Sequence, residues 1–250
     1  DGLPDGYAVG QNSADSNAIG VFLNINVTLK SGGGDIFIAG AEGPTNTAWY
    51  GSVFVDYGGK IDSGIGRIAI WGKALPGTNA GSQGIALNYG TDNSGATMIT
   101  SNASTADAIS IYSDESANAS TDARGIVTYW YGATSTTRGN QGTQILATAA
   151  GGGITLTAIA GQSTSAYGHA LWLEYADILA MSGKITLNGA TKSNYADANG
   201  LETGQRGYTG SALRLGGAGS MWPTGRIITT PSGGSYDFTS SSSDIEINVD

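Results

Sequence analysis

Apolar and polar residues alternate in short segments along almost the whole chain, and Gly, Asn, Asp or Ser bounds nearly every segment. One such phrase begins with glycine, or once with alanine, and recurs at a period of roughly 30 residues, which is in the range of repeat architectures. Its copies begin at positions 34, 66, 96, 125, 153, 183 and 225; two clear examples are Gly34-Asp-Ile-Phe-Ile-Ala-Gly40 and Gly183-Lys-Ile-Thr-Leu-Asn-Gly189. Period-two alternation over segments of this length predicts β-strands, and the regular recurrence indicates a repeat protein.

A second strand-like phrase lies inside each repeat, after a polar connection. These second phrases begin at Gly20, Ser52, Gly84, Ala108, Gln144, Ala170 and Ala212. Equivalent phrases recur in the same order, and the connections are longer than the two-residue turns that join tight hairpins. We therefore expect residues 1–250 to form one all-β solenoid, a parallel β-helix of about seven or eight coils with roughly 30 residues each.

Alternation also predicts which side chains face the interior of such a coil. The expected inward residues are Ile36, Ile38, Ile68, Ile70, Ile154, Leu156, Ile185 and Leu187. The residues between them, Phe37, Ala69, Thr155 and Thr186, are expected to face outward. A single coil buries too little apolar surface to offset its loss of backbone entropy, so each coil requires its neighbours.

Composition narrows the classes of function. The chain has 41 Gly, 5 Pro and no Cys among 250 residues, with 40% apolar and 12% charged residues. This composition excludes a disordered chain, and the lack of cysteine excludes disulfides and thiol nucleophiles. A net charge of −9 argues against a nucleic-acid partner. The chain has no run of 18 apolar residues, so the sequence predicts no membrane-spanning helix. Because the chain starts without Met, we expect it to be part of a longer protein.

The phrase Gly183-Lys-Ile-Thr-Leu-Asn-Gly189, a polar spacer and a following Gly-x-Ala-Leu-x-Leu segment resemble the repeats of filamentous-haemagglutinin-like exoproteins. The resemblance runs from about Ala18 to Val249 and is strongest at Gly153–Gly189. It implies a right-handed parallel β-helix, secretion that is often by a two-partner route, and a role in adhesion, aggregation or toxin display. The secretion domain of that family is not visible here, so the resemblance assigns no functional residue.

Candidate catalytic residues have simpler structural explanations. His169 is the only histidine and stands without a nucleophile elbow, so we expect a surface or turn role for it. Carboxylates cluster in two polar stretches, Asp107, Asp114, Glu115 and Asp122 in one and Asp56 and Asp62 in the other. Turn-capping aspartates explain these positions, and we predict no catalytic, cofactor-binding or metal-binding residue. Bound calcium stays open, without ligands that the sequence identifies.

Two segments are candidates for partner contact. The stretch Val127-Thr-Tyr-Trp-Tyr-Gly132 is the most aromatic, and it either exposes a ring for a sugar or packs under a loop. The longest repeat unit, which begins at Gly183, contains an extra polar segment, 188–209, which we expect to form a side loop.

The sequence thus predicts a structural or adhesive segment of a secreted or cell-surface protein, without enzymatic activity and without a cofactor. Its expected partners are further copies of itself, joined end to end into filaments, and a cell-surface glycan or protein. The alternative is a polysaccharide-active β-helix enzyme or depolymerase, which would need clustered carboxylates on one outer face beside exposed aromatic residues.

Overall fold

Regular structure in this protein consists almost entirely of β-strands, as expected from the sequence. The computed structural model describes residues 6–10, 19–43, 51–75, 83–87, 95–119, 123–128, 143–161, 168–173, 176–191, 201–203, 213–215, 226–228 and 245–249. The predicted all-β fold is therefore confirmed.

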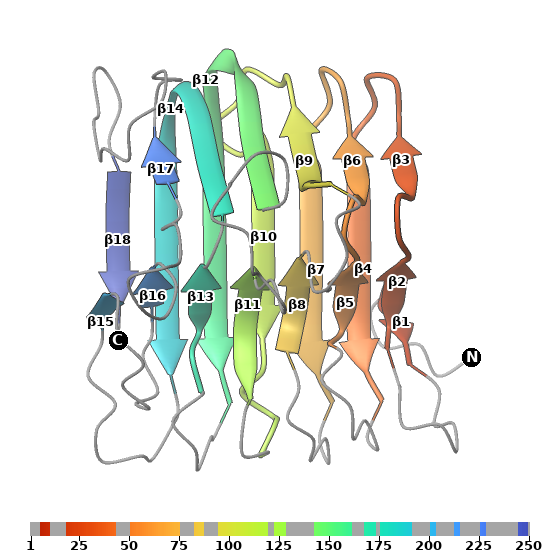
Figure 1. Ribbon diagram of the computed structural model, residues 1–250, viewed down its shortest axis with the longest axis vertical. Helices are drawn as coiled ribbons and strands as arrows, with labels where there is room; N and C mark the ends of the chain where they lie inside the picture. The colour runs from red at the N-terminus through yellow and green to blue at the C-terminus, as the bar shows by residue number, and fades with distance from the viewer. Residues whose placement is uncertain are drawn as a thin grey trace.

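The strands pair in parallel throughout (Figure 1). They are β1 (Ala8–Val9), β2 (Val21–Leu23), β3 (Thr28–Lys30), β4 (Ile36–Glu42), β5 (Val53–Val55), β6 (Lys60–Asp62), β7 (Ile68–Ala74), β8 (Gln83–Leu87), β9 (Thr97–Ser101), β10 (Ile109–Asp114), β11 (Arg124–Thr128), β12 (Thr143–Ala160), β13 (Leu171–Leu173), β14 (Ala176–Thr191), β15 (Leu201–Thr203), β16 (Leu213–Leu215), β17 (Arg226–Ile228) and β18 (Ile245–Val249).

Three faces can be distinguished. Face A holds β1, β4, β7, β10, the second halves of β12 and β14, and β18, whereas face B holds β3, β6, β9, the first halves of β12 and β14, and β17. Face C is the separate seven-stranded sheet of β2, β5, β8, β11, β13, β16 and β15. Faces A and B belong to one curled sheet because β12 and β14 each take part in both.

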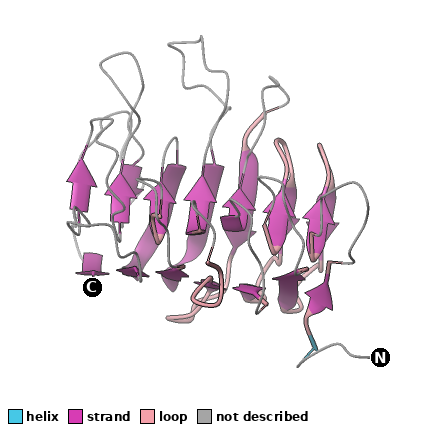
Figure 2. Cartoon of the chain, turned by 90° about the horizontal axis from the view of Figure 1, so that it is seen from below, coloured by secondary structure: helices cyan, strands magenta, loops and turns pink. Residues whose placement is uncertain are grey.

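The chain passes from face C to face B to face A, and then starts again on face C. Thus β2, β3 and β4 are followed by β5, β6 and β7, and each strand pairs with its counterpart in the next set. The described strands form six such sets, and β1 and β18 lie at opposite ends of the stack (Figures 1 and 2).

Identical registers place similar side chains above one another in columns. On face A, Ile36 pairs in turn with Ile68, Ile109, Ile154 and Ile185 along the stack. The eight residues predicted to face inward are all buried, whereas Phe37 is exposed and Ala69, Thr155 and Thr186 are partly exposed. The sequence alternation therefore predicted the orientation of these strands correctly.

Corners repeat from set to set as well. Between faces C and B, the Asn24 side-chain oxygen accepts a hydrogen bond from the amide of Ile25 (2.7 Å), and Asp56 does the same for Tyr57 (2.9 Å). Two residues later, Asn26 (φ 58°) and Gly58 (φ 70°) both have left-handed backbone, which asparagine and glycine adopt readily. These corners therefore depend on turn residues that the sequence repeats.

The predicted repeat frame is partly wrong. The phrases beginning at positions 34, 66, 153 and 183 lie on face A, but those at 96 and 225 lie on face B and that at 125 lies on face C. Each set also covers three faces rather than two; the sequence did not show the face B strands β3 and β6, because each is only three residues long and buries a single side chain, Leu29 or Ile61. So short a strand carries no readable alternation.

Sets also become longer along the chain than the regular sequence period suggests. The face C column runs through Val21, Val53, Ile85, Ile126, Leu171 and Leu213, and the later members are further apart in the sequence than the first three. Strand spacing is preserved while connections vary, because only the strands must remain in register.

Candidate functional site

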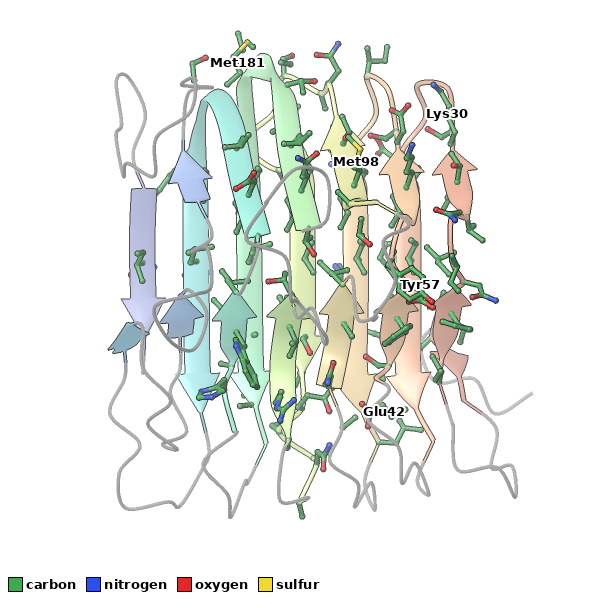
Figure 3. All side chains as sticks on the ribbon, in the orientation of Figure 1. Lys30, Glu42, Tyr57, Met98 and Met181 are labelled. Carbon is green, nitrogen blue, oxygen red and sulfur yellow. The ribbon has the colours of Figure 1, made fainter. Side chains whose placement is uncertain are left out.

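Two buried carboxylates mark the corner at which the chain leaves face A for face C. Glu42 ends β4 and Glu115 directly follows β10, and both side chains are fully buried. Glu42 pairs with Ala74 of β7, and the register of β7 with β10 places Glu115 on the other side of Ala74. Figure 3 labels Glu42 at the carboxyl end of β4. We call Glu42, Ser113 and Glu115 the acidic corner.

Ser113 and Glu115 face the start of β8 across this corner. A Cβ atom added to Gly84 would lie 1.9 Å from the Oγ of Ser113 and 2.6 Å from the Oε1 of Glu115. The Oγ of Ser113 is buried and has no hydrogen-bond partner among the described residues, and the other Glu115 oxygen, Oε2, accepts from Asn118 Nδ2 at 3.4 Å. Glycine at position 84 therefore makes room for polar side chains that point into the interior.

Burial raises the pKa of the Glu115 carboxyl well above its usual value, and the nearby charge of Glu42 raises the pKa further. The hydrogen bond from Asn118 acts in the opposite direction. Desolvation disfavours a charged carboxylate, and a second carboxylate close by adds like-charge repulsion. Glu115 therefore holds its proton at higher pH than an exposed glutamate.

A second buried polar group lies on face C. Arg124 pairs with Gln83 in β8, and the amide of Gly125 donates to the carbonyl of His169 (2.9 Å), which places the side chains of Gln83, Arg124 and His169 in neighbouring sets. All three are buried, and the Arg124 guanidinium lies 4.6 Å from the Trp172 ring centroid. Trp172 alternates with the core residues Leu171 and Leu173 of β13, so its ring lies on the side of face C opposite the core.

The expected surface role of His169 is wrong. Its side chain is fully buried and meets the Trp172 ring edge-on, with ring centroids 5.0 Å apart. The residue does stand just before β13, at the predicted junction of loop and strand. Face C is buried on both sides at Phe54, Ala86 and Val127, as is common for parallel sheets, and this burial extends to the histidine.

Aromatic side chains gather on the outer side of face A. Phe37 is 57% exposed and Trp71 is 39% exposed, and their rings meet edge-on with centroids 4.9 Å apart. Tyr112 pairs with Trp71 in the next set, and Lys73 lies 4.0 Å above the ring of Tyr7. We call Phe37, Trp71 and Tyr112 the aromatic band.

Trp71 and Tyr112 lie at the same register position in successive sets, and polar side chains occupy this position in the sets that follow. The next residues in register are Thr157, Asn188 and Asn248. Asn188 Nδ2 donates to Thr157 Oγ1 (3.0 Å), and Asn248 Nδ2 donates to Asn188 Oδ1 (2.8 Å). The outer side of face A thus changes from aromatic rings to a hydrogen-bonded polar ladder.

The predicted turn-capping role holds for three aspartates. The side chains of Asp56, Asp62 and Asp114 accept hydrogen bonds from the amides of Tyr57, Gly64 and Ser116, each at 2.9 Å. Glu115 differs, because its side chain is buried in the acidic corner.

Exposed ion pairs link successive sets. Arg67 bridges Asp35 (2.7 Å) and Asp107 (3.1 Å), and Lys30 pairs with Asp62 (2.9 Å). The hydrogen bond to Arg67 lowers the pKa of Asp35, and the hydrogen bond to Lys30 lowers the pKa of Asp62. Within the described residues of the predicted acidic stretch, Asp107 precedes β10, Asp114 ends it and Glu115 is buried, so these carboxylates do not converge on one outer face.

Other predicted contact segments lie mainly outside the described residues. This applies to Tyr129, Trp130 and Tyr131, to Asp122, and to much of the expected side loop at 188–209. Within that loop, residues 188–191 belong to β14, and β15 pairs with β16 in register.

Within the described residues, no group of three or more His, Cys, Asp or Glu side chains is arranged to hold a metal ion. No helix in that part of the chain is long and apolar enough to cross a membrane. Comparison with protein-family models, curated proteins and solved structures found no match for this chain.

Proposed function

We propose that this chain is a structural and adhesive segment of a secreted or cell-surface protein, folded as a right-handed parallel β-helix that joins further copies end to end. The parallel, in-register pairing of six successive strand sets supports this proposal. Right-handed winding is what connections between parallel strands adopt in nearly all proteins. Regular stacking of this kind gives a stiff rod whose ends are open strands.

Within the described residues, the first set leaves strand edges and apolar side chains uncovered. Within the described part of the chain, β2 pairs with β5 and β3 pairs with β6, and neither has a partner strand on its other side. Phe22, Ile25 and Val27 are 46%, 40% and 38% exposed. At the other end, Ile247 is 40% exposed although its partner Leu187 is fully buried. A second copy could cover such surfaces by continuing the sheets.

Charge at the first set is expected to prevent this association. The double variant Phe22→Lys/Ile25→Lys should raise the dissociation constant for self-association more than tenfold, because lysine on an edge opposes pairing with another strand. Sedimentation velocity over a range of protein concentrations, with electron microscopy of the same samples, measures the effect.

Ile65→Lys is the matched control, because Ile65 is 72% exposed at a corner of the second set rather than at the end of the stack. This variant should associate like the parent protein. A parent protein that stays monomeric at high concentration would contradict end-to-end joining, and equal loss in the control would indicate lateral association instead.

The aromatic band supports the adhesive part of the proposal. Exposed, flat aromatic side chains stack on the apolar faces of sugar rings, and the neighbouring amides and hydroxyls of face A can hydrogen-bond sugar hydroxyls. Repetition along a filament would strengthen individually weak contacts.

Removing the rings should weaken binding without unfolding the protein. We expect Phe37→Ala/Trp71→Ala to lose most binding on a glycan array or to intact cells, while its melting temperature changes little because both side chains lie on the outer side of face A, away from the core. Ile65→Ala removes an exposed apolar residue outside the band and should bind normally. Unchanged binding by the double variant would count against the band as the contact surface.

A further inference from the structure

The acidic corner places two carboxylates inside the stack, one on each side of Ala74. Strand spacing of about 4.8 Å puts the backbones of Glu42 and Glu115 roughly 9–10 Å apart, with Ala74 between them. Alanine is short enough to let two glutamate side chains approach each other above and below it. Both side chains are fully buried.

The charged groups of the surrounding strands have contacts of their own. On β7, Lys73 lies over the Tyr7 ring, and on β11, Arg124 lies against Trp172. On β10, Asp114 caps a turn through Ser116, and its negative charge adds to the raised pKa of Glu115. The neighbouring positions on the other packed strands are uncharged: Ser52 before β5, Gln83 on β8 and Ala160 on β12.

The acidic corner also contains the buried hydroxyl group of Ser113. In the part of the chain that the structure describes, its buried Oγ has no hydrogen-bond partner, and both this atom and Glu115 Oε1 lie against the backbone of Gly84. A hydroxyl can donate to a carboxylate or accept from a protonated carboxyl group. The Ser113 hydroxyl is therefore a polar group that lies in the same corner as the Glu115 carboxyl.

We propose that Glu42 and Glu115 hold one proton between them at neutral pH, and that the stack is strengthened by acid through this corner. Two carboxylates that share a low-dielectric site cannot both ionise without a large penalty. The raised pKa of Glu115 agrees with this assignment.

The sign of the pH effect follows from proton binding. Between the ordinary glutamate pKa near 4.5 and the raised pKa of the folded state, the folded protein retains a proton that the unfolded chain has lost. Stability therefore falls as pH rises through this window, and the unfolding equilibrium constant increases by up to about tenfold per pH unit.

Denaturant unfolding between pH 5 and pH 8 tests the proposal. The parent protein should lose stability with rising pH, whereas Glu115→Gln should be nearly independent of pH and more stable than the parent protein at pH 8. Infrared spectra at pH 7 should contain a protonated carboxyl band that Glu42→Gln/Glu115→Gln lacks.

Glu246→Gln is the matched control. Glu246 is an exposed glutamate whose pKa is lowered by its hydrogen bond with Lys184, so its titration lies mostly below the test range. This variant should keep the pH slope of the parent protein. A flat profile in the parent protein, or an unchanged slope in Glu115→Gln, would overturn the proposal. So would stabilisation by Ca²⁺ that Glu115→Gln abolishes, because the corner would then be a cation site.

Discussion

Ile99→Ala is expected to lower the free energy of unfolding by about 2–5 kcal/mol, the usual range for removing a large aliphatic side chain from a packed core. Ile99 lies on β9 and is fully buried. It belongs to the face B column that also contains Leu29, Ile61, Ile145 and Ile178. A cavity at this position removes contacts with the sets on both sides.

Leu29→Ala is the matched control, because Leu29 occupies the same column in the first set and is only partly buried. Its loss should cost about 1 kcal/mol, since part of the side chain already contacts water. Urea unfolding of both variants at low protein concentration, followed by circular dichroism, gives the comparison. Equal costs would show that neighbouring sets do not support one another as the columns imply.

The Ile99 variant should also broaden the unfolding transition. In stacked repeats, each unit is stabilised mainly by its nearest neighbours, so a weak unit in the middle separates two halves that then unfold less cooperatively. A lower denaturant dependence of the unfolding free energy would report this separation.

The columns of buried residues were predictable from the sequence because alternation is local. Ile36, Ile38, Ile68 and Ile70 all occur at every second position in their segments, and all are buried. Grouping the strands into sets was less predictable, since short apolar phrases of similar composition occur on all three faces. Only the pairing register shows that the phrase at Gly34 belongs to face A and the phrase at Gly125 to face C.

The acidic corner was missed although a signal was present. Glu42 continues the inward positions of Ile36 and Ile38, and Glu115 continues those of Ile109 and Ile111. Extending the alternation beyond the apolar residues would have placed both glutamates inside. Their proximity could not be predicted, because they lie far apart in the sequence and the intervening connections vary in length.

The leading glycines of the repeat lie where the backbones of adjacent sets approach each other closely. A Cβ atom at Gly66 would lie 2.2 Å from the carbonyl oxygen of Gly34 in the preceding set. The same close approach occurs at Gly153, 2.2 Å from the oxygen of Ala106, and at Gly183, 1.9 Å from the oxygen of Gly152. At the corner between faces B and A, the backbones of adjacent sets therefore approach too closely for any other residue.

Gly66→Ala should accordingly destabilise the protein by roughly 1–3 kcal/mol or more, because the added methyl group meets backbone that cannot move without breaking the register. Gly34→Ala provides the control: Gly34 is the counterpart of Gly66 in the first set, and a Cβ atom there meets no described residue within 4 Å. Its φ is not in the left-handed region, so alanine should be neutral or stabilise by up to about 1 kcal/mol through lower entropy of the unfolded chain. Thermal and urea unfolding of the two variants should therefore shift in opposite directions or differ strongly in size. Similar losses would mean that the glycines serve the local turn rather than the contact between sets, whereas a loss confined to Gly66→Ala would tie the repeated glycine directly to stacking.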